Sequence, residues 1–394
     1  MHALSDLKVL EMGQLIAGPF CAKTLGDFGA QVIKIESPEG GDPLRKWRVM
    51  RHDTSLWWHV QSRNKRSVCL DLRQAQGQAI ARRLAQDADI LIENFSPGTL
   101  EKWGMGPEVL QALNPRLIVV RISGFGQTGP YKQHPGFALI GEAMGGLRHL
   151  SGEPGRKPVR VGVSIGDTLA ALHATVGIFA AVQARHKTGR GQVVDVALSE
   201  SVLNVMESLV PEYAQAGVVR QPAGSALPGI TPSNAYPCQD GLVLVAGNGD
   251  GIFKRLMQAI GRDDLAHDPA LADNTGRNAQ AAHIDQAIEA YTASRTVQAV
   301  MDTLQAARVP VGKVYTAQDI AQDPQFAARD MLQTHMAYDG EPITQPGVVP
   351  KLSDTPGAIE RRAPRLGEHT DEVLLAAGYT ATELAQWREA GVIA

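Results

Sequence analysis

Asp167 carries the carboxylate with the clearest chemical context in this sequence. It lies in the segment SIGDTLAAL, directly before a predicted helix over residues 168–187. A carboxylate in that place caps the helix by accepting backbone N–H bonds, or is kept ionised by the helix dipole as a nucleophile toward an acyl group. The neighbouring residues leave both roles open. The helix is predicted from apolar residues at spacings of three or four, which would form one buried stripe: Leu169, Leu172, Val176, Phe179 and Val182.

Two glycine-rich segments are candidate ligand-binding turns. Residues 124–129 read GFGQTG, which has the GxGxxG spacing of a dinucleotide-binding loop. Such a loop must open a helix, and Pro130 prevents this, so we favour a turn at the carboxyl edge of a sheet, where α/β proteins bind ligands. Residues 246–251 read AGNGDG after a predicted strand. They form either a plain strand-to-helix turn or a mobile lid at Gly247, Asn248 and Gly249.

Several other chemistries lack their sequence signatures. The eleven histidines include no HExxH motif and no HxH pair with a matching carboxylate, so no metal site is expected. The sequence has no GxSxG elbow and no GxxxxGK[ST] loop. Hydrolase and kinase functions are therefore without support.

The bulk composition favours a cytoplasmic protein. A net charge of −3 gives no indication of a nucleic-acid or membrane-surface partner. The first residues, MHALSDLKVLEMG, lack the basic and apolar regions of a signal peptide, and the apolar segment 169–182 is too short to cross a bilayer. The three cysteines are far apart and show no CxxC spacing, which fits a reducing compartment. They are Cys21, Cys69 and Cys238.

Strand and helix patterns alternate through the first 150 residues. Apolar runs such as LKVLEM, AQVIKIE, DILIENF and LIVVRISGFG are separated by helical segments, which predicts a doubly wound parallel α/β sheet. A chain of 394 residues exceeds what one core usually serves, so a second domain is expected. Loop-like composition at 215–230 precedes two strand-like runs and three helical segments. We predict a large domain over 1–215, a smaller α+β domain over 225–325 and a tail over 326–394.

Segments spread in order over nearly the whole chain share one family pattern. They include IAGPF (16–20), LGDFGAQVIKIESPEGGD (25–42), NKRSVCLDL (64–72), ENFSPG (93–98), SGFGQTGP (123–130), GDTLAALHA (166–174), TGRGQVVDVAL (188–198), PSNAYPCQDGLVLVAGN (232–248), VPVGKVYT (309–316) and APRLGEHTDEVL (363–374). Together they resemble the class III CoA-transferases, the family of formyl-CoA, carnitine and dicarboxylate CoA-transferases. The resemblance implies a Rossmann-like large domain built from both chain ends, with 326–394 returning to it, and a homodimer of interlocked chains.

The same resemblance implies that Asp167 is the nucleophile of a CoA transfer between carboxylic acids. The carboxylate attacks an acyl-CoA to give an aspartyl anhydride, and CoA thiolate converts this to an aspartyl-CoA thioester. Backbone amides of Ile16 and Ala17 are the implied donors to the developing oxyanion. The implied substrates are a CoA thioester and small carboxylic acids, with no tightly bound cofactor.

CoA contacts are also carried over by position. Cationic side chains suit the phosphates and an aromatic ring suits adenine or pantetheine, although each residue also fits an ordinary surface or core role. The contacts are Leu70, Arg73, Asn94, Phe95 and Lys102.

Two departures from family patterns narrow the reaction. Residues 246–251 lack the run of four glycines found in oxalate-specific members. Gly136-Phe137 stands where related 2-methylacyl-CoA racemases have a His-Asp pair, and His134 lies two residues early, so proton exchange is disfavoured. Racemase and non-catalytic CoA-binding protein remain the alternatives.

Members with this kind of lid segment often use succinyl-CoA, so a dicarboxylate pair is the hypothesis for the two acids: succinate with glutarate, malate or citramalate. An arginine would then hold the distal carboxylate, unless these are solvated surface arginines. The candidates are Arg45, Arg121, Arg148 and Arg160.

Overall fold

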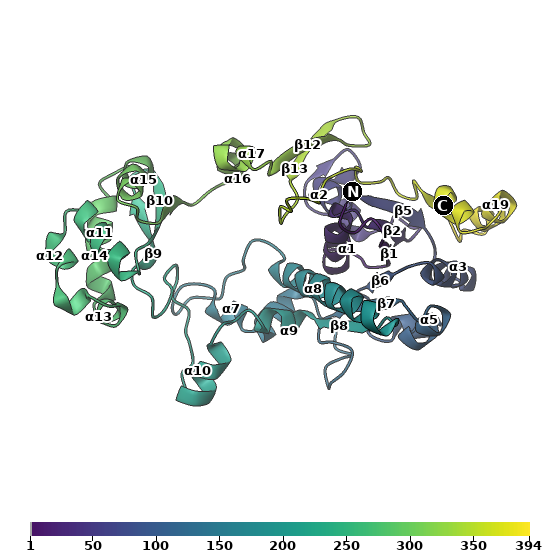
Figure 1. Cartoon of the computed structure of the whole chain (residues 1–394), viewed down its shortest axis with the longest axis horizontal. Coiled ribbons are helices and arrows are strands. Elements are labelled where there is room, and N and C mark those ends of the chain that lie inside the picture. Colours follow the sequence, from purple (N-terminus) through teal and green to yellow (C-terminus); the bar gives the residue numbers. More distant parts are fainter. Residues whose placement is uncertain (1) are drawn as a thin grey trace. The chain divides into compact units, whose positions relative to one another are not determined.

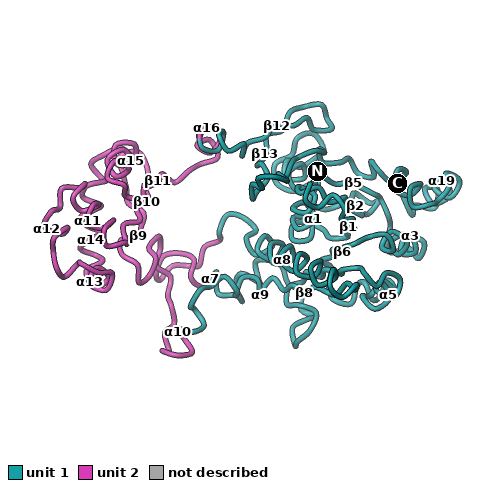
Figure 2. Tube along the Cα trace, viewed as in Figure 1, with its two compact units in different colours: residues 1–148, 161–212, 325–394 teal, residues 149–160, 213–324 magenta. Residues whose placement is uncertain are grey.

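The computed structural model describes residues 2–394, which form two compact units. The large unit comprises residues 1–148, 161–212 and 325–394, and the small unit comprises residues 149–160 and 213–324 (Figure 2). The large unit is thus assembled from both ends of the chain. Residues 149–160, which the sequence analysis placed inside the large domain, pack instead with the small unit.

A six-stranded sheet is the framework of the large unit (Figure 1). Its strands run in the order β5-β2-β1-β6-β7-β8, and every neighbouring pair is parallel. The predicted parallel α/β sheet is therefore confirmed. The strands are β1 (Lys8–Glu11), β2 (Gln31–Glu36), β5 (Lys65–Cys69), β6 (Ile90–Glu93), β7 (Ile118–Ser123) and β8 (Val193–Ala197).

Helices cover both faces of this sheet because successive strand residues point to opposite sides. Ile90 and Ile92 contact the core on one face, shared with α1 (Ala17–Asp27) and α8 (Ile165–Thr188). Leu91 points to the other core. That second core also contains residues of helices α3 (Ala75–Gln86), α4 (Thr99–Lys102), α5 (Pro107–Leu113), α18 (Thr370–Ala376) and α19 (Ala381–Glu389), the last two from the C-terminal segment.

The remaining elements of the large unit are short. Residues 99–113 form two short helices in place of one, because Gly104 and Gly106 interrupt the segment and Pro107 starts the second helix. The other elements are η1 (Pro43–Lys46), β3 (Met50–Arg51), β4 (Thr54–Ser55), α2 (Leu56–Gln61), α6 (Ala138–Met144), α9 (Leu198–Leu203), β12 (Leu332–Met336) and β13 (Pro342–Pro346). Helices α7 (Leu147–Leu150), α10 (Leu209–Ala216) and α17 (Pro324–Ala328) cross the boundaries between the units.

The small unit is an antiparallel sheet covered by helices. Its strand order is β11-β10-β9, and inward-facing Val243 and Val245 join a core with Leu256, Ile284 and Leu304. The strands are β9 (Ser233–Cys238), β10 (Gly241–Ala246) and β11 (Val311–Lys313), and the helices are α11 (Asp250–Ala259), α12 (Asp263–Ala266), η2 (Pro269–Leu271), α13 (Asn274–Ala279), α14 (Ala281–Thr292), α15 (Val297–Ala306) and α16 (Ala317–Gln322).

Helix α8 corrects two expectations from the sequence. It begins at Ile165 with Ser164 at the N-cap, so Asp167 is not the cap but the third helical residue. The predicted stripe of large apolar residues is also not the buried face, because Leu172, Val176 and Phe179 are exposed. The buried face consists of small residues and one isoleucine that let α1 approach closely: Ala170, Ala171, Ala174, Ile178 and Ala181.

The length argument against a membrane span also fails for α8. With 24 residues, it is long and apolar enough by length and composition to cross a bilayer. Its small-residue face nevertheless packs in the core against α1 and the sheet, so the helix has one buried face and one exposed apolar face. The exposed face therefore needs an explanation of its own.

A buried histidine in α2 makes stability depend on pH. His59 packs against the ring of Tyr338 with centroids 5.4 Å apart, and among residues 2–394 neither of its ring nitrogens has a hydrogen-bond partner. Burial lowers the pKa of His59, and likewise that of His369, below the usual 6.5. The unfolded chain therefore takes up protons that the folded chain resists, and stability falls as pH drops below about 6.5.

We expect His59→Leu to reduce this acid sensitivity. Between about pH 7.5 and about pH 5.5, the thermal midpoint of the variant should fall less than that of the parent, because one proton-binding group of the unfolded chain is gone. Differential scanning fluorimetry at the two pH values measures this. The exposed His186→Leu serves as the control; equal losses in the parent and both variants would contradict the prediction.

Candidate active site

Asp167 and the loop before α1 lie at the same edge of the large unit. Helix α1 follows β1, and α8 runs back to the start of the parallel strand β8, so both helices begin at the carboxyl edge of the sheet. The two helices pack together, with Cys21 Sγ 3.5 Å from Thr175 Oγ1. Asp167 is half-buried in the first turn of α8, where the helix dipole favours its ionised form. The geometry suits an ionised carboxylate that reaches a ligand at this edge.

The backbone at Ile16 and Ala17 offers donors at that edge. Ile16 is the N-cap of α1 and Ala17 its first residue, and both are buried. The first N–H groups of a helix have no intrahelical acceptor. Within residues 2–394, no hydrogen bond from either N–H is found. Two unused donors at this edge of the sheet are suited to binding a negatively charged oxygen of a ligand.

The five residues predicted to contact CoA lie at two places on the same carboxyl edge. Leu70 and Arg73 follow β5, whereas Asn94 and Phe95 follow β6, and Lys102 ends α4. Strands β2 and β1 stand between β5 and β6, so the two groups are about 14 Å apart at ordinary strand spacing. Such a spread fits an extended ligand.

Their side chains are unequally available. Leu70 lies in the core at 1% exposure, so its backbone alone can face a ligand. Asn94 is bonded to Gln14: it accepts from the Gln14 N–H at 2.7 Å and donates to the Gln14 carbonyl at 2.9 Å. Phe95 packs edge-on against Trp103, with centroids 5.1 Å apart. Lys102 is exposed. Because the Asn94 amide is already bonded to Gln14, we assign Asn94 to the support of the loop before α1.

Arg73 is already paired with carboxylates. Its guanidinium bonds to Asp71 at 2.9 Å and to Glu39 at 3.0 Å, and the bond from Arg73 lowers the pKa of Asp71 to about 2. The pair with Glu39 is exposed at the surface, whereas Asp71 is buried, so a phosphate can exchange with Glu39 at little cost.

The arginines considered for a distal carboxylate also differ. Arg45 is buried in a two-point pair with Glu36 and lies over Trp58. Arg121 is buried between Glu93 and Glu101. Both are committed to structure and are poor candidates. Of the other two candidates, Arg148 pairs with buried Glu142, and Arg160, in the small unit, is exposed.

The segment proposed as a lid is held in place within the small unit. It joins β10 to α11, and the Asn248 carbonyl accepts a 2.7 Å bond from Arg277, which is fully buried. The Gly247 N–H donates to the Pro232 carbonyl at 2.9 Å, and a Cβ at Gly247 would lie 2.5 Å from the Leu256 side chain. These contacts favour an ordered turn with Asn248 exposed.

The loop after β7 has the form expected from Pro130, because no helix begins before α6 at Ala138. Asp195 of β8 accepts from the Gln127 N–H at 3.0 Å and holds this turn. His134 stacks on Tyr131 with centroids 5.0 Å apart, and Phe137 is exposed. Phe137, one of the two positions matched to the racemase pair in the sequence, is thus an exposed aromatic residue at the start of α6.

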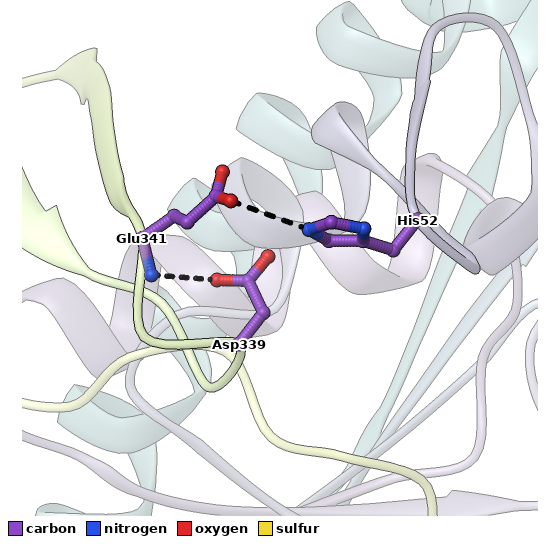
Figure 3. A group of neighbouring side chains, drawn as sticks. All are labelled: His52, Asp339 and Glu341. Atoms are coloured by element: carbon purple, nitrogen blue, oxygen red, sulfur yellow. Dashed lines mark hydrogen bonds and ion pairs between the residues drawn. The ribbon is translucent and has the colours of Figure 1, made fainter.

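One group of side chains has the composition of a metal site (Figure 3). His52 comes from the β3–β4 turn, and Asp339 and Glu341 come from the β12–β13 turn; His52 Nε2 lies 3.4 Å from Glu341 Oε1. Arg51, however, lies 2.9 Å from Asp339 and 3.8 Å from Glu341. Because an arginine already pairs with both carboxylates, we assign no metal here.

Comparisons with known proteins agree on one family. The profile of CoA-transferase family III matches residues 4–370. A succinyl-CoA–D-citramalate CoA-transferase of Chloroflexus aurantiacus is 47% identical over 394 residues, covering 99% of this chain and 98% of the relative. A succinyl-CoA–L-malate CoA-transferase beta subunit of the same species is 41% identical, covering 94% and 93%. A solved CAIB/BAIF family protein from Brucella suis superposes with a TM-score of 0.84 at 35% identity, covering 95% and 99%.

Proposed function

The chain belongs to CoA-transferase family III, and from this premise we propose that it moves CoA from succinyl-CoA to a 2-hydroxy dicarboxylic acid of the malate or citramalate type. The observation that carries the proposal is the full-length 47% identity to an enzyme named for succinyl-CoA and D-citramalate. A relative named for L-malate supports the same acid class, because both acids are hydroxylated succinates.

Asp167 is the proposed nucleophile. Its carboxylate attacks the thioester carbonyl of succinyl-CoA, the C–S bond breaks, and CoA leaves as the thiolate. The product is a mixed anhydride between Asp167 and succinate. The thiolate then attacks the aspartyl carbonyl of the anhydride, which releases succinate and leaves an aspartyl-CoA thioester. The first-turn position in α8 supports this role because it favours the ionised carboxylate that attack requires.

The second half reverses these steps with the new acid. The acceptor carboxylate attacks the aspartyl thioester, and the thiolate leaves again. The thiolate then attacks the acceptor's acyl carbonyl, so the new acyl-CoA forms and the Asp167 carboxylate is restored. Each attack creates an oxyanion, and the N–H groups of Ile16 and Ala17 are the proposed donors to it. No cofactor takes part in this proposed sequence.

We also propose that the protein works as a homodimer, with interlocked chains as in the family pattern. The support is the apolar surface of the large unit where α6, α8 and α9 pack together. Monomeric proteins rarely expose apolar surface on this scale, and an obligate partner buries it. The exposed side chains there include Phe137, Met144, Leu172, Val176, Phe179 and Leu203.

Mass spectrometry of CoA products tests the proposed function. We expect succinyl-CoA with D- or L-citramalate or with L-malate to yield the matching new acyl-CoA, and oxalate to yield none. Glutarate in the same panel shows whether the hydroxyl group is required. Transfer to none of these acids would contradict the proposal. If a 2-methylacyl-CoA then exchanged its C2 proton for deuterium, the chain would be a racemase; CoA affinity without either activity would make it a binding protein.

A further inference from the structure

Four charged side chains form a fully buried cluster beside the loop at residues 13–17. Lys34 of β2 lies 2.8 Å from Glu11 of β1 and 2.9 Å from Asp42, which follows β2. Lys65 of β5 lies 2.7 Å from the second carboxylate oxygen of Glu11. All four side chains are at most 1% exposed, and the two positive charges balance the two negative ones.

The cluster bonds directly to the backbone of the loop. Lys34 Nζ donates to the Gly13 carbonyl at 2.8 Å, so its three protons face three acceptors. Asp42 accepts from the Leu15 N–H at 3.0 Å. Lys65 Nζ donates to the Pro19 carbonyl at 2.8 Å, in the first turn of α1. Three points of the loop and helix start are thus fixed by side chains of the sheet.

Two further side chains bond to the backbone of the loop. Asn94 holds both backbone groups of Gln14, and Gln61 donates to the Ile16 carbonyl at 2.9 Å. Leu15 has φ of 63°, a left-handed conformation that a leucine adopts only when its surroundings impose it. The scaffold therefore bonds to the backbone on both sides of Ile16 and Ala17, while the N–H groups of these two residues have no partner within residues 2–394.

Burying four charges is a poor way to gain stability, because well-packed apolar residues do as well. Charges fixed by several bonds do define positions closely, and an oxyanion site needs donors held within a few tenths of an ångström. We propose that Lys34 and Asp42 are positioning residues, which orient the Ile16 and Ala17 N–H groups toward the oxyanion formed in the transfer. The effect on catalysis rests on the proposed function, whereas the ordering of the loop by Lys34 and Asp42 does not.

The test compares two double variants, each of which removes one buried positive charge and one buried negative charge. Lys34→Met/Asp42→Asn removes the bond to the Gly13 carbonyl and leaves the Leu15 N–H only a neutral acceptor. The matched control Arg63→Met/Asp27→Asn removes an equally buried pair at the far end of α1. Should the first variant not fold, Asp42→Asn alone takes its place, because it keeps the shape and removes the charge on the loop side.

We expect hydrogen–deuterium exchange in the peptide covering residues 12–20 to become at least about tenfold faster in the cluster variant than in the control. The kcat of CoA transfer should fall about a hundredfold, with KM for the acyl-CoA changed less than about threefold, since the lost interaction belongs to the transition state. Unchanged exchange would overturn the positioning role, even if the parent transfers no CoA. If exchange became faster but kcat stayed equal to that of the control variant, only the catalytic role would be overturned. A parent protein that is inactive with every acid would instead refute the proposed function.

Discussion

Asp167→Asn is expected to abolish CoA transfer, with kcat at least about 10⁴-fold below that of the parent, because the amide is no nucleophile toward a thioester. The fold should survive. A first-turn carboxylate contributes about 0.3–1 kcal/mol through the helix dipole, so the thermal midpoint should change little. Acyl-CoA formation from succinyl-CoA, followed by mass spectrometry, measures the activity.

A matched variant separates chemistry from helix electrostatics. Asp371→Asn removes a first-turn carboxylate from α18, where it pairs with Arg388, and should leave kcat unchanged. In the parent, succinyl-CoA without acceptor should also add the mass of CoA, less one water, to the peptide that contains Asp167. An adduct on another residue, or full activity in Asp167→Asn, would refute the proposed nucleophile.

Val176→Asp is expected to remove the dimer. Val176 is 67% exposed in the single chain, so in a monomer the change would cost little. In a dimer that buries this face of α8, it would place an unpaired charge in an apolar interface at a cost of several kcal/mol. Light scattering after size-exclusion chromatography should show two chains for the parent and one chain, or aggregate, for the variant.

Val109→Asp is the control for the expected loss of the dimer in Val176→Asp. Val109 is an exposed apolar residue of α5, on the opposite side of the sheet from α8, and its replacement should leave the mass of two chains unchanged. A parent that elutes as one chain would contradict the dimer. If the parent instead floated with lipid vesicles and Val176→Asp did not, the apolar face of α8 would be a membrane surface.

The large-unit sheet could be predicted because its signal is local. Runs such as DILIENF and LIVVRIS contain the unbroken apolar stretches ILI and LIVV, which are typical of strands buried on both faces, and β6 and β7 lie there. The two faces of α8 could not be assigned in the same way. Both faces are apolar, and the face made mostly of alanines is buried because small side chains let α1 approach closely. A periodicity of three or four shows that a helix has an apolar face, but not which neighbour covers it.

The roles of the charged residues were decided by the tertiary structure. Arg45 and Arg121 looked available for a substrate in the sequence, whereas buried carboxylates from other segments hold both. Lys34 lies in the strand QVIKIE, where alternation suggests a solvated lysine, yet it is fully buried against Glu11 and Asp42. The energy of a buried charge depends on partners from other segments of the chain. Composition and spacing therefore do not show whether a charged residue is buried.

The position of Asp167 depends on both the sequence and the tertiary structure. The sequence by itself determined that a carboxylate stands at the start of a long apolar helix in a chain patterned like the CoA-transferases. Its place as third residue of α8, at the sheet edge shared with the unused N–H groups of Ile16 and Ala17, was decided only by the fold. Parallel strands bring segments about 150 residues apart to one edge, and a reaction centre exists only where they meet.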